Sequence, residues 1–229
     1  MKIEIWSDII CPFCYIGKKK FELALEQFEG KDKVEVVWKS FQLDPSATTD
    51  KNVSVIENLA TKKGISLEHS EKLHDDLTQV AAEVGLEYNF DKAIVANTLS
   101  AHQLTHFAAT QHLQDKAEEA LFKAYFTEGK NIDDQETLAQ LAQDLGLNKE
   151  EAISALQNKT LLQNVQKDIR EAQEIGVRGV PFFVFNRQFA ISGAQPVESF
   201  LEVLRKAATE ERNIEVISGA SCDVDGNCD

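Results

Sequence analysis

Two cysteines near the start of the chain carry its clearest chemistry. Cys11 and Cys14 enclose Pro12 and Phe13, directly after the alternating apolar segment Lys2–Trp6 and directly before apolar residues at helical spacing. A sulfur at a helix N-terminus lies beside unpaired amide groups, which favour the thiolate form. Pro12 suits the first helical turn, because its missing N–H is not needed there. The pattern predicts dithiol–disulfide exchange, with Cys11 as the more exposed thiol and Cys14 resolving any mixed disulfide formed there.

A zinc site is the main alternative for these cysteines. A Cys-x-x-Cys pair is half of a tetrahedral zinc site, and the chain has a second pair, Cys222 and Cys228. A zinc knuckle usually lies on a turn among glycine or basic residues, whereas Cys11 and Cys14 lead directly into a predicted helix. We therefore favour a redox pair over a zinc site or a purely structural pair, and we predict no bound metal.

The composition limits the class of partner. The 229 residues include 24 Lys and Arg against 38 Asp and Glu, a formal net charge of −14. This acidity disfavours nucleic acid and anionic membrane surfaces as partners, and no apolar run approaches the roughly 20 residues that span a bilayer. The first residues lack the basic start of a secretory signal. We expect a cytoplasmic protein, in which a cysteine pair is more often reactive than structural.

The cysteines must be positioned by a sheet that is assembled from both ends of the chain. A second strand is predicted at Lys33–Phe41, and two more at residues 181–185 and 188–192, joined by a turn at Asn186–Arg187. From about Val53 to Gln173 the apolar spacing is helical, with almost no strand signal. A last helix is expected after Pro196. The first and last thirds must therefore pair into one sheet, with a helical block inserted between them.

The chain resembles the DsbA-like thioredoxin-fold oxidoreductases, and most closely their FrnE-type branch. The resemblance is carried by Ser7–Gly17 around the cysteines, by Gly176–Val184, and by the helical insertion between these segments. It covers about residues 1–208. It implies an α/β, thioredoxin-like fold, in which a central mixed β-sheet carries a large all-helical insertion.

We expect three regions on this basis. Residues 1–45 and 174–212 would form a split thioredoxin-like domain, and residues 46–173 would form the inserted helical subdomain, including the connecting helix. Residues 213–229 would form a flexible C-terminal tail, which carries Cys222 and Cys228.

The resemblance also implies roles for individual residues. Cys11 would be the attacking thiolate and Cys14 the resolving thiol. Pro181 would follow a cis peptide bond, and Val180 would offer its backbone groups to an extended client peptide, which binds by strand addition. Pro12 and Phe13 would also contact the client, as they lie between the cysteines.

The same resemblance leaves the direction of electron flow open. Members of the branch commonly have Trp where this chain has Phe13, and the residues between the two sulfurs tune the redox potential. No cofactor is implied beyond the redox-active disulfide itself, although glutathione or a thioredoxin-type reductant could reduce it. The expected partners are cysteine-containing protein clients.

The two tail cysteines suggest an auxiliary redox pair. A disulfide between Cys222 and Cys228 would close a very short loop, worth on the order of 2 kcal/mol in the chain-entropy model. Such a loop stabilises little, so exchange of electrons with Cys11 and Cys14, or with clients, explains the pair better. Metal capture and plain surface cysteines stay open as alternatives.

Three further polar residues are candidates for a functional site. His102 and His106 lie four apart on a predicted helix, but no third metal ligand is evident near them. Asp8 could accept a proton from a buried Cys14, although capping or turn formation is its simpler role. None of the three is predicted to carry the chemistry.

A glutathione-dependent isomerase or transferase is the alternative function. The kappa-type and hydroxychromene carboxylate isomerase group has the same inserted architecture, but its members usually carry Ser where this chain has Cys11. Two cysteines therefore argue against that chemistry. A zinc-binding interaction module without turnover is the third and least favoured hypothesis.

Overall fold

The structure of the chain is a computed structural model, which describes residues 1–209, 216–217 and 222–223, with only the backbone of the last two segments. It divides into two compact units. The sheet unit comprises Met1–Leu43 and Asp168–Asp229, and the helical unit comprises Asp44–Lys167. Helix α8 (Lys159–Glu174) begins in the helical unit and ends in the sheet unit. No described helix is both long and apolar enough to cross a membrane.

The sheet unit is built on a five-stranded sheet in the order β2-β1-β6-β7-β8. Its strands are β1 (Lys2–Ser7), β2 (Glu35–Ser40), β6 (Phe182–Phe185), β7 (Phe189–Ser192) and β8 (Val216–Ile217). β1 runs parallel to β2 and antiparallel to β6, while β7 is antiparallel to β6 and parallel to β8. The predicted mixed sheet, assembled from both ends of the chain, is confirmed.

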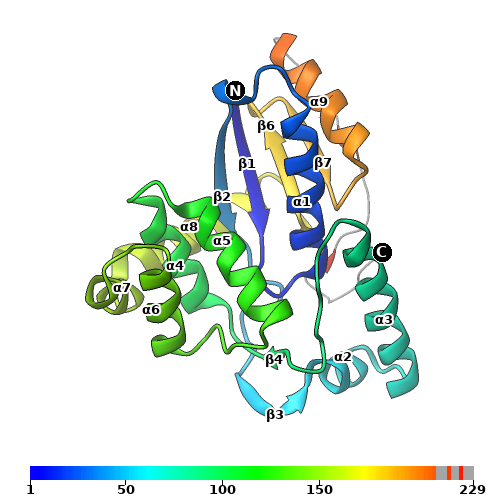
Figure 1. The fold of residues 1–229 in the computed structure, drawn as a ribbon, viewed down its shortest axis with the longest axis vertical. Helices are drawn as coiled ribbons and strands as arrows, with labels where there is room; N and C mark the ends of the chain where they lie inside the picture. The colour runs from blue at the N-terminus through cyan, green and yellow to red at the C-terminus, as the bar shows by residue number, and fades with distance from the viewer. Residues whose placement is uncertain (210–215, 218–221, 224–229) are drawn as a thin grey trace. The chain divides into compact units, whose positions relative to one another are not determined.

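One face of this sheet packs on two helices, α1 (Pro12–Glu26) and α9 (Val197–Thr209) (Figure 1). The alternation predicted for β1 places Ile3 and Ile5 in the core, where both are fully buried. Phe21 from α1 and Phe200 from α9 meet them there, with ring centroids 5.8 Å apart. Burial of these large side chains fixes α1, and therefore the residues at its start, against the sheet.

The opposite face of the sheet holds charged groups against the last turns of α8. Trp6 donates from Nε1 to the backbone oxygen of Asp168 over 3.0 Å. The Asp168 carboxylate accepts from Lys39 Nζ at 2.9 Å and from the Ser40 amide at 3.1 Å. Arg187 bridges the carboxylates of Glu4 and Glu171. The two buried carboxylates of this cluster, Glu4 and Asp168, are tolerated because each is paired and hydrogen-bonded.

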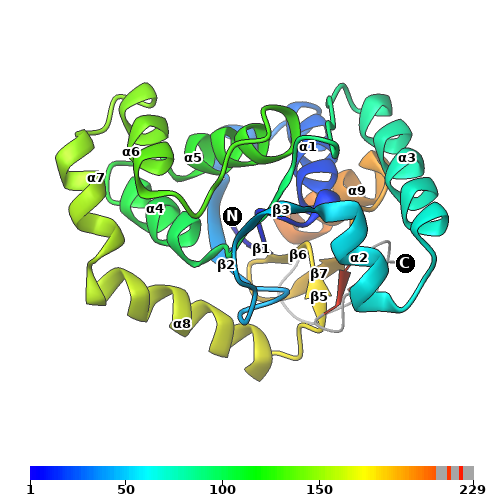
Figure 2. The same ribbon diagram turned by 90° about the horizontal axis from the view of Figure 1, so that it is seen from below.

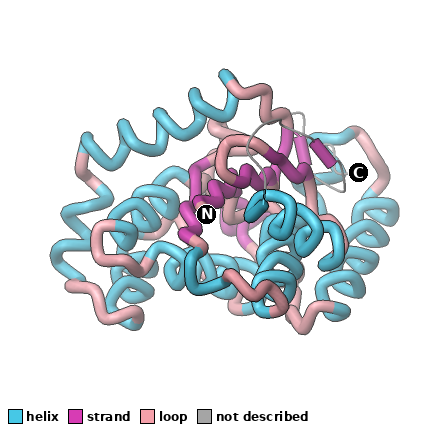
Figure 3. The backbone as a smooth tube through the Cα atoms, turned by 90° about the horizontal axis from the view of Figure 1, so that it is seen from above, coloured by secondary structure: helices cyan, strands magenta, loops and turns pink. Residues whose placement is uncertain are grey.

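The helical unit is mostly helix (Figure 3). It contains α2 (Val55–Lys63), α3 (Leu67–Glu83), α4 (Leu99–Ala109), α5 (Gln114–Phe122), α6 (Gln135–Asp144) and α7 (Lys149–Leu156), with a π-helical turn at Lys123–Thr127 and the start of α8, the long helix of Figure 2. Several helices begin at residues that cap helices by hydrogen bonding. Ser54 and Glu57 form a capping box at α2, and Asp134 caps α6.

Two short strands interrupt the predicted helical block. β3 (Asp50–Ser54) pairs antiparallel with β4 (Ile94–Val95), so Ile94 and Val95 extend a strand rather than a helix. The helical spacing suggested otherwise because this pairing joins segments some forty residues apart and leaves no local periodicity. A further pair of short strands, β5 (Gly179–Val180) and β9 (Cys222–Asp223), lies within the sheet unit.

Candidate active site

Cys11 lies in the turn that connects β1 to α1. Its amide donates to the Asp8 carbonyl at 3.0 Å, and its own carbonyl accepts from the Cys14 amide at 3.0 Å. The Cys11 backbone is extended, with φ −83° and ψ 114°, which makes this residue the N-cap of α1, with Pro12 in the first helical turn. The sulfur therefore belongs to the residue at the positive end of the helix, as the sequence suggested.

Both sulfurs are covered, which corrects one expectation. Cys11 and Cys14 are each 0% exposed, so Cys11 is not the more exposed thiol in this form of the protein. Both are free thiols rather than a disulfide. The helix position was correctly read from sequence, but the cover over Cys11 comes from tertiary contacts, which local patterns do not encode.

Burial raises the pKa of the Cys14 thiol well above its ordinary value of 9.0. Hydrogen bonding to the Cys11 sulfur and the charge of that sulfur raise the pKa further, whereas the Ser7 hydroxyl and the Asp8 backbone act in the opposite direction. Cys14 is therefore held as a neutral thiol near neutral pH, which is the state expected of a thiol kept in reserve until a mixed disulfide forms.

The segment before Pro181 lies directly against the first sulfur. Cys11 Sγ is 3.5 Å from the Val180 carbonyl oxygen, and the Val180–Pro181 peptide bond is cis. Gly17, in the second turn of α1, makes this close approach sterically feasible. A Cβ atom on Gly17 would lie 2.9 Å from Pro181 Cγ, closer than real Cβ contacts come.

Gly17 is the site residue that sequence reasoning missed. In the sequence it belongs to the segment Ser7–Gly17 that carries the family resemblance, and no pattern there gives it a role of its own. A glycine inside an otherwise helical pattern was the available signal, because such a glycine costs helix stability and usually has a packing reason.

Asp8 has the structural role that the sequence analysis favoured. It is fully buried, and its Oδ2 atom accepts from the Leu43 amide at 2.8 Å. Together with the Asp8 carbonyl, which accepts from Cys11, this bond ties the β1–α1 turn to the chain that follows β2. A carboxylate used in this way positions the turn.

The other predicted site residues fall into two groups. Pro12 and Phe13 are half-buried at the start of α1. Cys222 contributes its backbone to β9, opposite Val180, but its side chain and the whole of Cys228 lie outside the described residues. The predicted auxiliary redox pair, and most of the predicted tail 213–229, therefore stay expectations.

The described residues contain no group of three or more His, Cys, Asp or Glu side chains that could hold a metal ion. His102 is buried on α4, and His106 lies in the last turn of the same helix.

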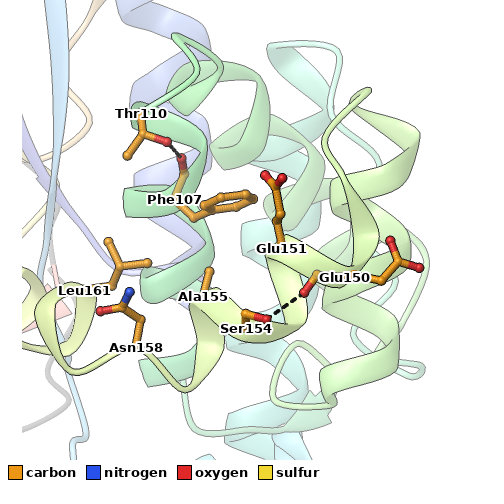
Figure 4. A pocket seen from close by; sticks show the side chains of 8 residues that line it. All are labelled: Phe107, Thr110, Glu150, Glu151, Ser154, Ala155, Asn158 and Leu161. Carbon is orange, nitrogen blue, oxygen red and sulfur yellow. Dashed lines mark hydrogen bonds between the residues drawn. The ribbon is translucent and has the colours of Figure 1, made fainter.

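A pocket of about 410 Å³ lies within the helical unit (Figure 4). Its lining combines apolar side chains with polar ones, including two glutamates from α7: Phe107, Thr110, Glu150, Glu151, Ser154, Ala155, Asn158 and Leu161. Neither cysteine of the described pair contributes to it, so it is separate from the dithiol site.

The fold and the dithiol turn define a known class of protein. Residues 2–205 match the model of the DSBA-like thioredoxin domain, and the chain belongs to this family. Its fold is accordingly the DsbA-like one, with a central mixed sheet and a helical insertion, as predicted.

Individual relatives agree with this assignment. A solved structure described as a probable DsbA oxidoreductase from Streptomyces coelicolor is 37% identical, with a TM-score of 0.86 over 100% of this chain and 98% of that chain. The uncharacterized protein YwbO of Bacillus subtilis is 31% identical over 92% of this chain and 96% of its own length. A cytosolic disulfide reductase, DsbM from Pseudomonas aeruginosa, shares the fold at 17% identity, with a TM-score of 0.64 over 91% of this chain and 98% of that chain.

Proposed function

We propose that this protein is a cytoplasmic protein thiol–disulfide oxidoreductase or isomerase of the FrnE-type branch. The observation that carries the proposal is the placement of Cys11 as the N-cap of α1, with its sulfur 3.5 Å from the Val180 carbonyl and Cys14 one turn further on. An attacking sulfur, a resolving sulfur and a strand edge for the client backbone are thereby collected at one place.

The exchange proceeds in two successive attacks by a thiolate on a disulfide. The Cys11 thiolate attacks one sulfur of a client disulfide, which forms a mixed disulfide and releases the other client sulfur as a thiolate. Cys14 then gives its proton to solvent and attacks the Cys11 sulfur, so that the Cys11–Cys14 disulfide forms and the second client sulfur leaves as a thiolate. The client is reduced by two electrons and the enzyme is oxidised. A small or protein dithiol reductant then restores the enzyme, and the reverse sequence oxidises a client.

The raised pKa of Cys14 suits this order of events. An ionised Cys14 would repel a thiolate at Cys11 and so disfavour the form of Cys11 that attacks the client. As a neutral buried thiol, Cys14 waits until the mixed disulfide has replaced the charge on Cys11.

Insulin reduction with a glutathione or dithiol reductant tests the proposal. The wild-type protein should accelerate precipitation of the insulin B chain, and Cys11→Ser should fall to the rate without enzyme. Leu23→Ala, at an exposed position of α1 outside the dithiol turn, serves as the control for handling and folding. Equal rates for wild type and Cys11→Ser would refute the proposal.

The same preparation tests the alternative function. Glutathione conjugation or glutathione-dependent isomerisation that survives in Cys11→Ser, with no insulin reduction by wild type, would favour the glutathione-dependent group. Fold similarity to a 2-hydroxychromene-2-carboxylate isomerase, at 16% identity and a TM-score of 0.65 over 91% of this chain and 94% of that chain, supports the shared architecture alone.

A further inference from the structure

The strand edge beside Cys11 already has an occupant from the same chain. β9 (Cys222–Asp223) pairs antiparallel with β5 (Gly179–Val180), with Val180 opposite Cys222 and Gly179 opposite Asp223. Residues directly opposite in an antiparallel pair have Cα atoms about 4.5–5.5 Å apart. The Val180 carbonyl oxygen lies 3.5 Å from Cys11 Sγ. The tail backbone is therefore paired with the residue that contacts the attacking sulfur.

A second pairing anchors the same tail on the sheet. β8 (Val216–Ile217) lies parallel to β7, with Val216 opposite Ala190 and Ile217 opposite Ile191. This pairing brings the chain back along the sheet after α9, only a few residues before β9. The tail therefore contacts the sheet unit by its backbone at two places, once at the edge of the main sheet and once at β5.

The edge of β5 to which a client peptide would add is covered in this arrangement. Gly179 and Val180 are buried, and Cys11 is 0% exposed. One edge of a two-residue strand has a single row of N–H and C=O groups, and one partner strand occupies all of them by hydrogen bonding. A client peptide that adds to this edge must therefore first displace β9.

We propose that the C-terminal segment Cys222–Asp223 is a built-in competitor for the client-binding edge, which shields the dithiol from extended protein clients until it is displaced. This inference rests on the proposed function, because it assumes that clients dock on β5. The competitor acts through its backbone, so it is independent of any redox role of the tail cysteines.

Tethering explains how so short a strand can compete. A segment joined to its site by a short linker has an effective concentration in the millimolar range, far above that of most clients. If the tail is seated for about nine-tenths of the time, the apparent affinity of a client falls about tenfold. The apparent affinity of a small disulfide should fall much less, because such a substrate does not bind to a strand edge.

The test compares tail variants that carry no tail thiol. The reference is Cys222→Ser with Cys228→Ser. The strand-breaking variant is Cys222→Pro with Asp223→Pro and Cys228→Ser, which removes both amide hydrogens of β9. The third variant is truncated after Asn213. For each, kcat/KM is measured with a protein disulfide, insulin, and with a small one, oxidised glutathione, and amide hydrogen exchange is measured at residues 179–180.

The strand-breaking and truncated variants should both exceed the reference about tenfold in kcat/KM for insulin, with little change for oxidised glutathione and with faster exchange at residues 179–180. Equal insulin rates in all three would overturn the inference. A higher kcat/KM for insulin in the truncated variant alone would also overturn it, because the tail would then obstruct clients by its size and not by strand pairing. An equal increase in kcat/KM for oxidised glutathione would overturn it as well. If the reference reduces insulin no faster than a Cys11→Ser protein, the proposed function fails instead. In that case the hydrogen exchange still tests the pairing, because equal exchange at residues 179–180 in all three variants would show that β9 does not cover β5.

Discussion

The Sγ atom of Cys11 lies 3.5 Å from the carbonyl oxygen of Val180, although the two residues are 169 positions apart in sequence. The contact joins the start of α1 to the strand that precedes Pro181. Gly17 permits this close approach of the two elements, because it leaves room for the Pro181 ring.

The pH dependence of stability should report on Cys14. Its pKa is raised in the folded state, mainly by burial, so the folded protein keeps the Cys14 proton at pH values where the unfolded chain loses it. The stabilisation is complete below the ordinary pKa of 9.0 and is lost as pH rises above it. Reduced wild type should therefore lose about 1.4 kcal/mol of unfolding free energy per pH unit above pH 9, relative to Cys14→Ala. Urea unfolding of both proteins between pH 7 and 10 checks this, and parallel curves would contradict the assignment.

Gly17→Ala should disturb the site through Pro181. The new Cβ would meet Pro181 Cγ at 2.9 Å, and overpacking of this kind costs about 1–3 kcal/mol. Ala recovers up to about 1 kcal/mol of helix propensity, so we expect a net loss of up to about 2 kcal/mol. The rate of insulin reduction should fall as well, because Val180 and the Cys11 sulfur are pushed apart. Leu23→Ala, at an exposed position of the same helix, is the control and should leave the rate unchanged.

Sequence patterns predicted the parts of the fold that depend on neighbouring residues. Alternation in Lys2–Trp6 was sufficient for β1, and Pro12 marked the first turn of α1. Asn186 and Arg187 lie in the predicted hairpin turn with φ values of 50° and 58°, the left-handed conformation of both central residues of a type I′ turn. Each of these signals is complete within a few residues of chain.

The remaining features depend on segments that meet only after folding. The β3–β4 pair, the fit of Gly17 on Pro181, and the cover over Cys11 all join distant parts of the sequence. Lys18 is a similar case, because a lysine in a charged run is usually solvated, whereas this side chain is buried against Glu22 and lies 5.9 Å from the Trp38 ring. Contacts of this kind have no periodicity, so a single sequence does not reveal them.

The charged cluster on the second face of the sheet should be more costly to break than a surface ion pair. Burial lowers the pKa of Lys39, but Asp168 and Glu171 outweigh this effect, and the pKa is raised overall. Asp168→Asn would remove one charged partner from this lysine, and a loss of about 1.5–3 kcal/mol is expected, typical of a hydrogen bond to a charged group. Glu202→Gln, in the exposed pair with Lys206, should cost less than about 1 kcal/mol. Equal losses in urea unfolding would mean that the cluster is not a stabilising network.

The two cysteines should behave differently when each is replaced. Without Cys14 no internal sulfur can attack the mixed disulfide at Cys11, so Cys14→Ser should accumulate covalent complexes with client proteins. Cys11→Ser should form none at this site, because the buried Cys14 is held as a neutral thiol and is a poor nucleophile. Both variants are made with Cys222→Ser and Cys228→Ser, so that the tail thiols neither resolve nor form complexes. Non-reducing electrophoresis with peptide mass mapping identifies the linked cysteine. Complexes joined through Cys14 in the Cys11→Ser protein would show that the attacking and resolving roles are reversed.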